Sequence, residues 1–171
     1  DLRRLHDTAT SLAQSVRHLS HDLHPTVLQH TGLVSALTAH CAEVERLYGT
    51  ASSCSAEGNF GSLAPEAKLC LYRIAQEALR NVIAHAGASR ADVRLLHTGD
   101  HAELTIADDG SGFDVTRPPK RRRGLGLVSI AERVRFAGGT LSITAEVGKG
   151  TCVHVRIPAN GLVRSDGRPG A

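Results

Sequence analysis

The stretch from Asp108 to Gly126 constrains this chain most, because it joins a strand end to a helix start through closely spaced glycines. Alternating apolar residues at 102–106 lead directly into Asp108, which places this acid at the end of a strand. Gly110 and Gly112 follow it at every second position. Glycine has no side chain, so a planar base can approach its backbone closely, and a carboxylate can accept a hydrogen bond from an exocyclic amine. The first half of the stretch therefore predicts a site for a nucleotide base.

The second half of the stretch is a basic loop that leads into a helix. Residues 113–123 contain two prolines and five lysines or arginines. Gly124 and Gly126 follow, and Leu125 and Leu127 open an apolar pattern of helical spacing. A helix N-terminus preceded by glycines offers free N–H groups and a positive dipole end to a phosphate. The alternative is a hairpin loop rich in turn-forming residues, followed by a flexible basic loop with no ligand.

Composition restricts the class of protein. The chain has 171 residues and a mass of 18.1 kDa, which fits one domain with an extra element or two small domains. Hydrophobic residues make up 41% of the chain but aromatic residues only 3%, so the core must be aliphatic. The formal net charge is only +3, and the basic excess is concentrated at Lys120–Arg123. With so few aromatic side chains to stack on bases, we expect no nucleic-acid partner.

Location and redox state can also be predicted. No apolar run reaches the roughly 20 residues of a membrane span, and there is no signal-peptide pattern. We therefore expect a cytoplasmic fragment without membrane contact, whose parent could still be membrane-anchored; the absence of methionine suggests that it is excised from a longer chain. The four cysteines are Cys41, Cys54, Cys70 and Cys152. Their wide spacing favours reduced, buried thiols over disulfides or a metal site.

A heptad seam runs through residues 1–23. Its apolar positions are spaced 4, 3, 4, 3 and 4 residues apart, at Leu5, Ala9, Leu12, Val16, Leu19 and Leu23. A helix with such a seam must pack against another helix, and the rest of the chain supplies no equally long partner. We therefore expect a first unit over residues 1–25, ended by Pro25, that is half of a helical hairpin or part of a bundle with a second subunit. The alternative is a helix docked on its own domain.

Two further helices are predicted ahead of the main run of strands. The first spans about Gly32–Leu47, and the short polar segment at 50–57 after it is a candidate edge strand. The second spans residues 64–86 and is capped by Gly87. Its apolar stripe consists of Ala67, Leu71, Ile74, Ala78 and Val82.

A polar row lies beside that stripe. Its members are spaced four residues apart, at Arg73, Glu77, Asn81 and His85, so they share one face of the helix. Asn is a poor helix former, which suggests that something other than helix propensity keeps Asn81 there. An Asn oxygen can ligate Mg²⁺, and a Glu can polarise a water or a hydroxyl. The alternative is a polar stripe on the protein surface.

Alternating apolar residues predict four more strands. These lie at 91–95, 104–106, 141–147 and 153–157. The first two flank a turn at Gly99-Asp100, and residues 127–136 form a helix between the two pairs. The tail, residues 159–171, contains Gly, Arg and Pro and is predicted to be disordered.

Four motifs in this order carry a family resemblance. They are Glu77-x-x-x-Asn81 on a helix, Asp108-x-Gly110-x-Gly112, Gly124-x-Gly126, and Gly150-Thr151 ahead of a strand. The order resembles the superfamily of gyrase, heat-shock chaperone, histidine kinase and mismatch-repair ATPases. Within it the chain looks like a two-component sensor histidine kinase, in the subfamily with a short ATP lid whose acceptor His precedes an Asp. The stretch HDLHPTVLQHTGL resembles the passage from the second dimerisation helix to the catalytic domain, and the resemblance covers about residues 10–158.

The resemblance implies an α/β two-layer sandwich over residues 26–158, with a mixed five-stranded sheet and helices on one face, that binds Mg-ATP. Asp108 would hold the adenine amine, and Gly110 and Gly112 would shape the base pocket. Thr151 would back the adenine site through its hydroxyl.

The same resemblance implies the phosphate-side roles. Asn81 would ligate Mg²⁺ that bridges the phosphates, and Glu77 would lie near the transferring phosphate as a second candidate ligand. His85 would lie beside the phosphate chain. Gly124, Leu125, Gly126 and Leu127 would border the phosphates at the helix start.

The implied reaction passes the γ-phosphoryl group of ATP to a histidine and then to the receiver domain of a response regulator, in a homodimer formed through the 1–23 helix. The helix that carries the phosphate-accepting histidine should precede residue 1, so His6 and His21 are weak candidates for the acceptor. We favour the alternative that both are solvated histidines on a helix surface. One alternative is an anti-sigma-type serine kinase on the same fold, against which the heptad helix argues. The other is a degenerate nucleotide-binding or dimerisation module, against which the intact motifs argue.

Overall fold

The computed structural model describes residues 25–114 and 124–160 of the chain. The predicted heptad helix, together with His6 and His21, lies outside these residues, as does the tail from residue 161 onward. Most of the predicted lid, residues 115–123, also lies outside them.

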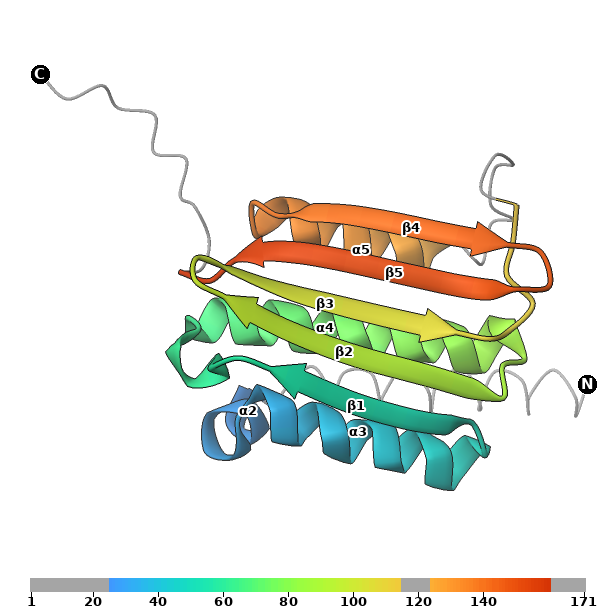
Figure 1. Ribbon diagram of the computed structural model, residues 1–171, viewed down its shortest axis with the longest axis horizontal. Helices are drawn as coiled ribbons and strands as arrows, with labels where there is room; N and C mark the ends of the chain where they lie inside the picture. Colours follow the sequence, from blue (N-terminus) through green and yellow to red (C-terminus); the bar gives the residue numbers. More distant parts are fainter. Residues whose placement is uncertain (1–24, 115–123, 161–171) are drawn as a thin grey trace, which may run out of the picture.

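A mixed five-stranded sheet forms one layer of the molecule (Figure 1). Its strands are β1 (Ala51–Glu57), β2 (Arg90–Thr98), β3 (His101–Asp108), β4 (Thr140–Glu146) and β5 (Gly150–Pro158). They are ordered β1-β2-β3-β5-β4; β1 pairs in parallel with β2, and the other neighbours are antiparallel. The four predicted strands and the candidate edge strand at 50–57 are thus confirmed.

The helices of the described residues form the second layer, on one face of the sheet (Figure 1). They are α2 (Pro25–Thr31), α3 (Leu33–Tyr48), the 3₁₀ turn η1 (Phe60–Ser62), α4 (Pro65–Asn81), the π-helical turn η2 (Val82–Ala86) and α5 (Gly124–Phe136). Helix α4 lies behind β2 and β3, and α5 lies behind β4 and β5 (Figure 1). This arrangement confirms the predicted two-layer sandwich. None of these helices is long and apolar enough to cross a bilayer.

The core lies between the two layers and is aliphatic, as the composition predicts. The apolar stripe of α4 faces the sheet, and Leu71 has no exposed surface. Leu104 of β3 and Val155 of β5 are equally buried, because alternate strand residues point toward the helices. The residues that alternate with these buried positions, such as Glu103 of β3 and His154 of β5, lie on the face of the sheet that no helix of the described residues covers. There His154 Nε2 is 3.3 Å from Glu103 Oε2.

Two boundaries differ from the sequence-based expectations. Pro25 begins the short helix α2, which we did not predict. Proline suits this position because the first turn of a helix needs no N–H donor. Ala159, which we assigned to the disordered tail, is 4% exposed. Its N–H donates to the carbonyl of Asp100 at 2.7 Å, and its carbonyl accepts from the N–H of Ala64 at 3.0 Å. The folded unit therefore extends beyond residue 158.

Candidate functional site

The C-terminal end of α4 carries part of the predicted polar row. After Asn81 the helix widens into η2, and Gly87 ends it in the left-handed conformation with φ 57°. Single π-helical turns of this kind are frequent at functional sites. Asn81, from the end of α4, and His85, from the widened turn, both line a pocket that opens between the helices and the sheet.

Asp108 is the last residue of β3 and lines the same pocket. Its Oδ1 accepts a hydrogen bond from the N–H of Gly110 at 2.9 Å. Thr151, its partner across the β3–β5 ladder, contributes a second backbone hydrogen bond to the carboxylate. Burial raises the pKa of Asp108, and the two backbone donors partly oppose that shift. A half-buried acceptor held in a fixed position is suited to recognising an amine.

The pocket encloses about 100 Å³. Six of the predicted nucleotide-binding or catalytic residues line it, namely Asn81, His85, Asp108, Gly112, Leu127 and Thr151. The remaining walls are mostly apolar and come from α4, η2, β3, β5 and the loop after β3. Apolar walls with a few fixed polar groups are typical of small-molecule sites. Glu77, Gly110 and Gly126 lie outside the lining, and Gly124 and Leu125 form the first two positions of α5.

Gly110 and Gly112 approach other parts of the backbone closely. A Cβ on Gly110 would collide with the carbonyl of Ala86 in η2. Gly112 has φ 55°, and a Cβ there would collide with the carbonyl of Glu146 at the end of β4. These glycines therefore let the loop after β3 pack against η2 and against the β4–β5 turn. Of the two, only Gly112 also lines the pocket.

The start of α5 covers Glu77 and Asn81. A Cβ on Gly126 would collide with the side-chain oxygens of both residues. The Glu77 carboxylate is ion-paired with the guanidinium of Arg80, whose Nε donates to Glu77 Oε2 at 3.1 Å. Asn81 Nδ2 is buried and has no hydrogen-bond partner in the described part of the chain. A buried amide with an unused polar atom fits a site for a bound group, and either orientation of the amide leaves one atom for it.

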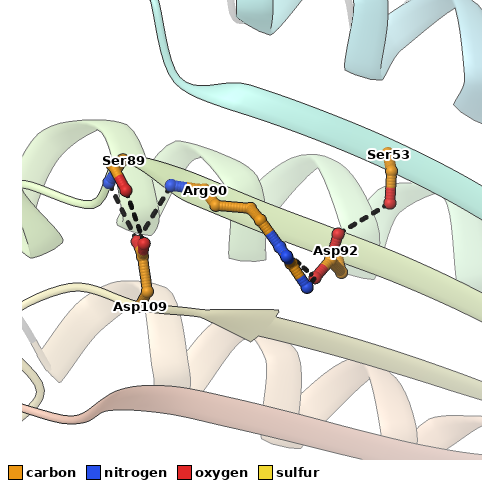
Figure 2. A network of polar contacts seen from close by, with 5 residues as sticks. All are labelled: Ser53, Ser89, Arg90, Asp92 and Asp109. Atoms are coloured by element: carbon orange, nitrogen blue, oxygen red, sulfur yellow. Dashed lines mark hydrogen bonds and ion pairs between the residues drawn. The ribbon is translucent and has the colours of Figure 1, made fainter.

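A polar network fixes the loop after β3 against β2 (Figure 2). Oδ1 of Asp109 accepts from the N–H groups of Ser89 and Arg90, both at 2.9 Å, and Oδ2 accepts from the Ser89 hydroxyl. These bonds, the Ser89 hydroxyl foremost, lower the pKa of Asp109. Arg90 in turn pairs with Asp92, which accepts from the hydroxyl of Ser53 on β1 at 2.7 Å. The network therefore fixes the backbone next to Asp108, whose side chain lines the pocket.

Sequence reasoning missed three residues of this region. Ser111 and Phe113 line the pocket, and Asp109 anchors its loop. A signal existed for two of them: Asp109 repeats an acid at a strand end, and Phe113 is one of only three phenylalanines in the chain. Wall residues such as Ile106 could not be identified, because in sequence they look like any other core position.

Comparison with known proteins gives consistent matches. Residues 67–161 match the family of histidine kinase-, DNA gyrase B- and HSP90-like ATPases. The sensor histidine kinase MctS of Rhizobium johnstonii is 39% identical over 146 residues, which cover 85% of this chain and 32% of that protein. The signal transduction histidine-protein kinase/phosphatase DegS of Bacillus subtilis is 31% identical over 138 residues, 78% of this chain and 36% of that protein. The chain thus spans about a third of the length of these relatives.

Solved structures share the fold. The histidine kinase domain of the blue-light activated histidine kinase of Erythrobacter litoralis EL346 superposes with a TM-score of 0.59 at 23% identity, covering 74% of this chain and 61% of that one. The mycobacterial sensor histidine kinase MprB gives a TM-score of 0.55 at 22% identity, covering 75% and 95%. Because the family match spans more than half of its residues, this chain belongs to the histidine kinase-, DNA gyrase B- and HSP90-like ATPases.

Proposed function

We propose that this chain is the ATP-binding catalytic domain of a two-component sensor histidine kinase, with Mg²⁺ as its cofactor. The main support is the composition of one pocket. It combines mostly apolar walls with the half-buried carboxylate of Asp108 and the buried Nδ2 atom of Asn81, which has no hydrogen-bond partner in the described part of the chain. The similarity to MctS over 85% of the chain adds to this support.

In this proposal the adenine base enters the apolar pocket. The carboxylate of Asp108 accepts a hydrogen bond from the exocyclic amine, and burial strengthens that contact because little water competes for it. Gly112 lies beside the base, and Gly110 shapes the pocket indirectly by allowing the loop to pack on η2. The hydroxyl of Thr151 backs the adenine site.

The phosphates then extend toward the start of α5. The side-chain oxygen of Asn81 would hold Mg²⁺, which would neutralise charge on the phosphates. Glu77 lies near the transferring phosphate, and His85 lies beside the phosphate chain. The N–H groups of residues 124–127 border the phosphates. Gly126 packs directly on the Glu77 and Asn81 side chains, so the first turn of α5 lies beside the proposed Mg²⁺ site.

The reaction is transfer of the γ-phosphoryl group from ATP to a histidine imidazole. The bond from the γ-phosphorus to the bridging oxygen of ADP breaks, and a phosphorus–nitrogen bond forms. The phosphoryl group then passes to an aspartate on the receiver domain of a response regulator. In the intact protein we expect a homodimer formed through the predicted helix at residues 1–23, an acceptor histidine on the predicted dimerisation helices, and a cytoplasmic location.

Calorimetric titration with a non-hydrolysable ATP analogue, with and without Mg²⁺, tests this proposal. We expect binding in the micromolar range that weakens markedly when Mg²⁺ is removed. GTP should bind much more weakly, because it presents a carbonyl where adenine presents an amine. The absence of binding at millimolar nucleotide would instead support the degenerate module, and equal affinities for ATP and GTP would remove Asp108 from the base site.

A further inference from the structure

Two thiols meet outside the proposed nucleotide site, between α3 and the edge strand β1. Cys41 belongs to α3 and is only 1% exposed, whereas Cys54 of β1 is partly exposed at the margin of the same core. Sγ of Cys41 lies 3.7 Å from the carbonyl oxygen of Ser53, the residue just before Cys54. The two thiols lie close enough for each to shift the pKa of the other. The fold thus brings together two sulfur atoms that are thirteen positions apart in the sequence.

The two thiols differ in reactivity. The neighbouring Cys41 thiol and, to a lesser degree, Thr38 lower the pKa of Cys54 despite its partial burial. A lowered pKa favours the thiolate of Cys54, and the thiolate is the nucleophilic form of a cysteine. The interaction with Cys54, together with burial, raises the pKa of Cys41, so this thiol stays protonated. The partly exposed Cys54 sulfur is thus the more reactive one, and the buried Cys41 sulfur lies beside it.

We propose that Cys41 and Cys54 form a peroxide-sensitive pair that closes to a disulfide and links α3 to β1. The Cys54 thiolate attacks one oxygen of hydrogen peroxide, the O–O bond breaks, and Cys54 sulfenic acid and hydroxide form. The Cys41 sulfur then attacks the Cys54 sulfur, the S–O bond breaks, and water leaves with the Cys41 proton. Two thiols are oxidised to one disulfide while the peroxide is reduced by two electrons.

The Cys41–Cys54 pair lies outside the pocket, but strand pairing connects the two regions. Cys54 pairs with Val93 of β2, and Val93 pairs with Ile106 of β3, which lines the pocket. The bond would therefore fix the outermost strand to its covering helix, two strands away from the nucleotide. Within the described residues, Cys70 contacts the carbonyl of Arg133, and Cys152 lies opposite Ala107 and Thr144 in the sheet, so these two cysteines serve as internal controls.

The experiment oxidises the reduced full chain with a small excess of hydrogen peroxide, blocks the remaining thiols with iodoacetamide and analyses the tryptic peptides by mass spectrometry. Trypsin cuts at Arg46, between Cys41 and Cys54, so the linked peptides can be identified. We expect a Cys41–Cys54 link and a fall from four free thiols to two, with Cys70 and Cys152 still alkylated.

Variants separate the steps of the proposal. Cys54→Ser should abolish the link, and Cys41→Ser should leave a sulfenic acid at Cys54 that dimedone traps. Cys152→Ser, the matched control, should form the link as the parent does. The proposal is overturned if Cys70 or Cys152 oxidises as fast as Cys54. It is equally overturned if mixed ¹⁵N-labelled and unlabelled chains show that the link forms only between molecules.

Discussion

Asp108 is the single residue on which the proposed base recognition depends. Asp108→Asn keeps the shape of the side chain but replaces an acceptor oxygen with an amide that can donate. Because a hydrogen bond to a charged group contributes about 1.5–3 kcal/mol, affinity for ATP should fall roughly 10- to 100-fold. Calorimetric titration of the parent and the variant measures this loss. Asp100→Asn, at the exposed β2–β3 turn, is the control and should bind ATP as the parent does.

Asp108 and its neighbour Asp109 should affect stability in opposite directions as the pH changes. The pKa of Asp109 in the fold lies below its ordinary value of 3.8, so its ionised form stabilises the fold above that value and this stabilisation is lost as the pH falls through the lowered pKa. The pKa of Asp108 is raised, so its contribution is greatest below 3.8 and is lost as the pH rises through the raised pKa.

Urea unfolding of two variants from strongly acidic to neutral pH measures these contributions. Asp109→Asn should unfold at a lower urea concentration than the parent at neutral pH, and the difference should vanish in strong acid. For Asp108→Asn, the stability relative to the parent should rise between acidic and neutral pH. The same pH trend in both variants would contradict the environments described for these carboxyls.

At the scale of elements, the start of α5 must fit against α4. Gly126→Ala would force a Cβ into Glu77 and Asn81. Overpacking of this kind costs about 1–3 kcal/mol, partly offset by the better helix propensity of Ala, worth about 1 kcal/mol. We therefore expect a modest loss of stability and a much larger loss of Mg-ATP affinity, because the displaced turn is the one that would border the phosphates.

Val128→Ala provides the matched control for this prediction, because Val128 is on the same helix and 53% exposed. It should change the free energy of unfolding by less than about 0.5 kcal/mol and leave Mg-ATP affinity unchanged. Unaltered nucleotide binding by Gly126→Ala would argue against a phosphate site at this turn.

At the scale of the whole molecule, the buried side chains of α4 pack the helical layer against the sheet. Leu71 is fully buried between the helices and the sheet, whereas Leu47 at the end of α3 is 52% exposed. Leu71→Ala removes the same atoms as Leu47→Ala but leaves a cavity, so it should reduce the free energy of unfolding by about 2–5 kcal/mol. Leu47→Ala should cost less than about 1 kcal/mol. Denaturant titration of both variants tests the assignment of the core, and equal losses would contradict it.

Local pattern was sufficient to predict most of the elements. The two-residue period of the strands and the apolar stripe of α4 follow from which face each element must bury, and burial of one face is a property of the segment itself. Asp108 could be assigned to a strand end for the same reason. The short helix α2 was missed, because its seven residues are too few to show a period.

The sequence by itself determined the elements and the candidate residues Asp108, Asn81 and His85, because spacing along the chain fixes which side chains share a face. The two-layer class came only from the family resemblance. Only the tertiary structure decided which distant residues meet. It set the strand order, the packing of Gly126 on Glu77 and Asn81, and the proximity of two cysteines, Cys41 and Cys54, that have no sequence signature. The reason is that such contacts depend on how whole faces pack in three dimensions, and no local pattern in the chain encodes the partner of a face.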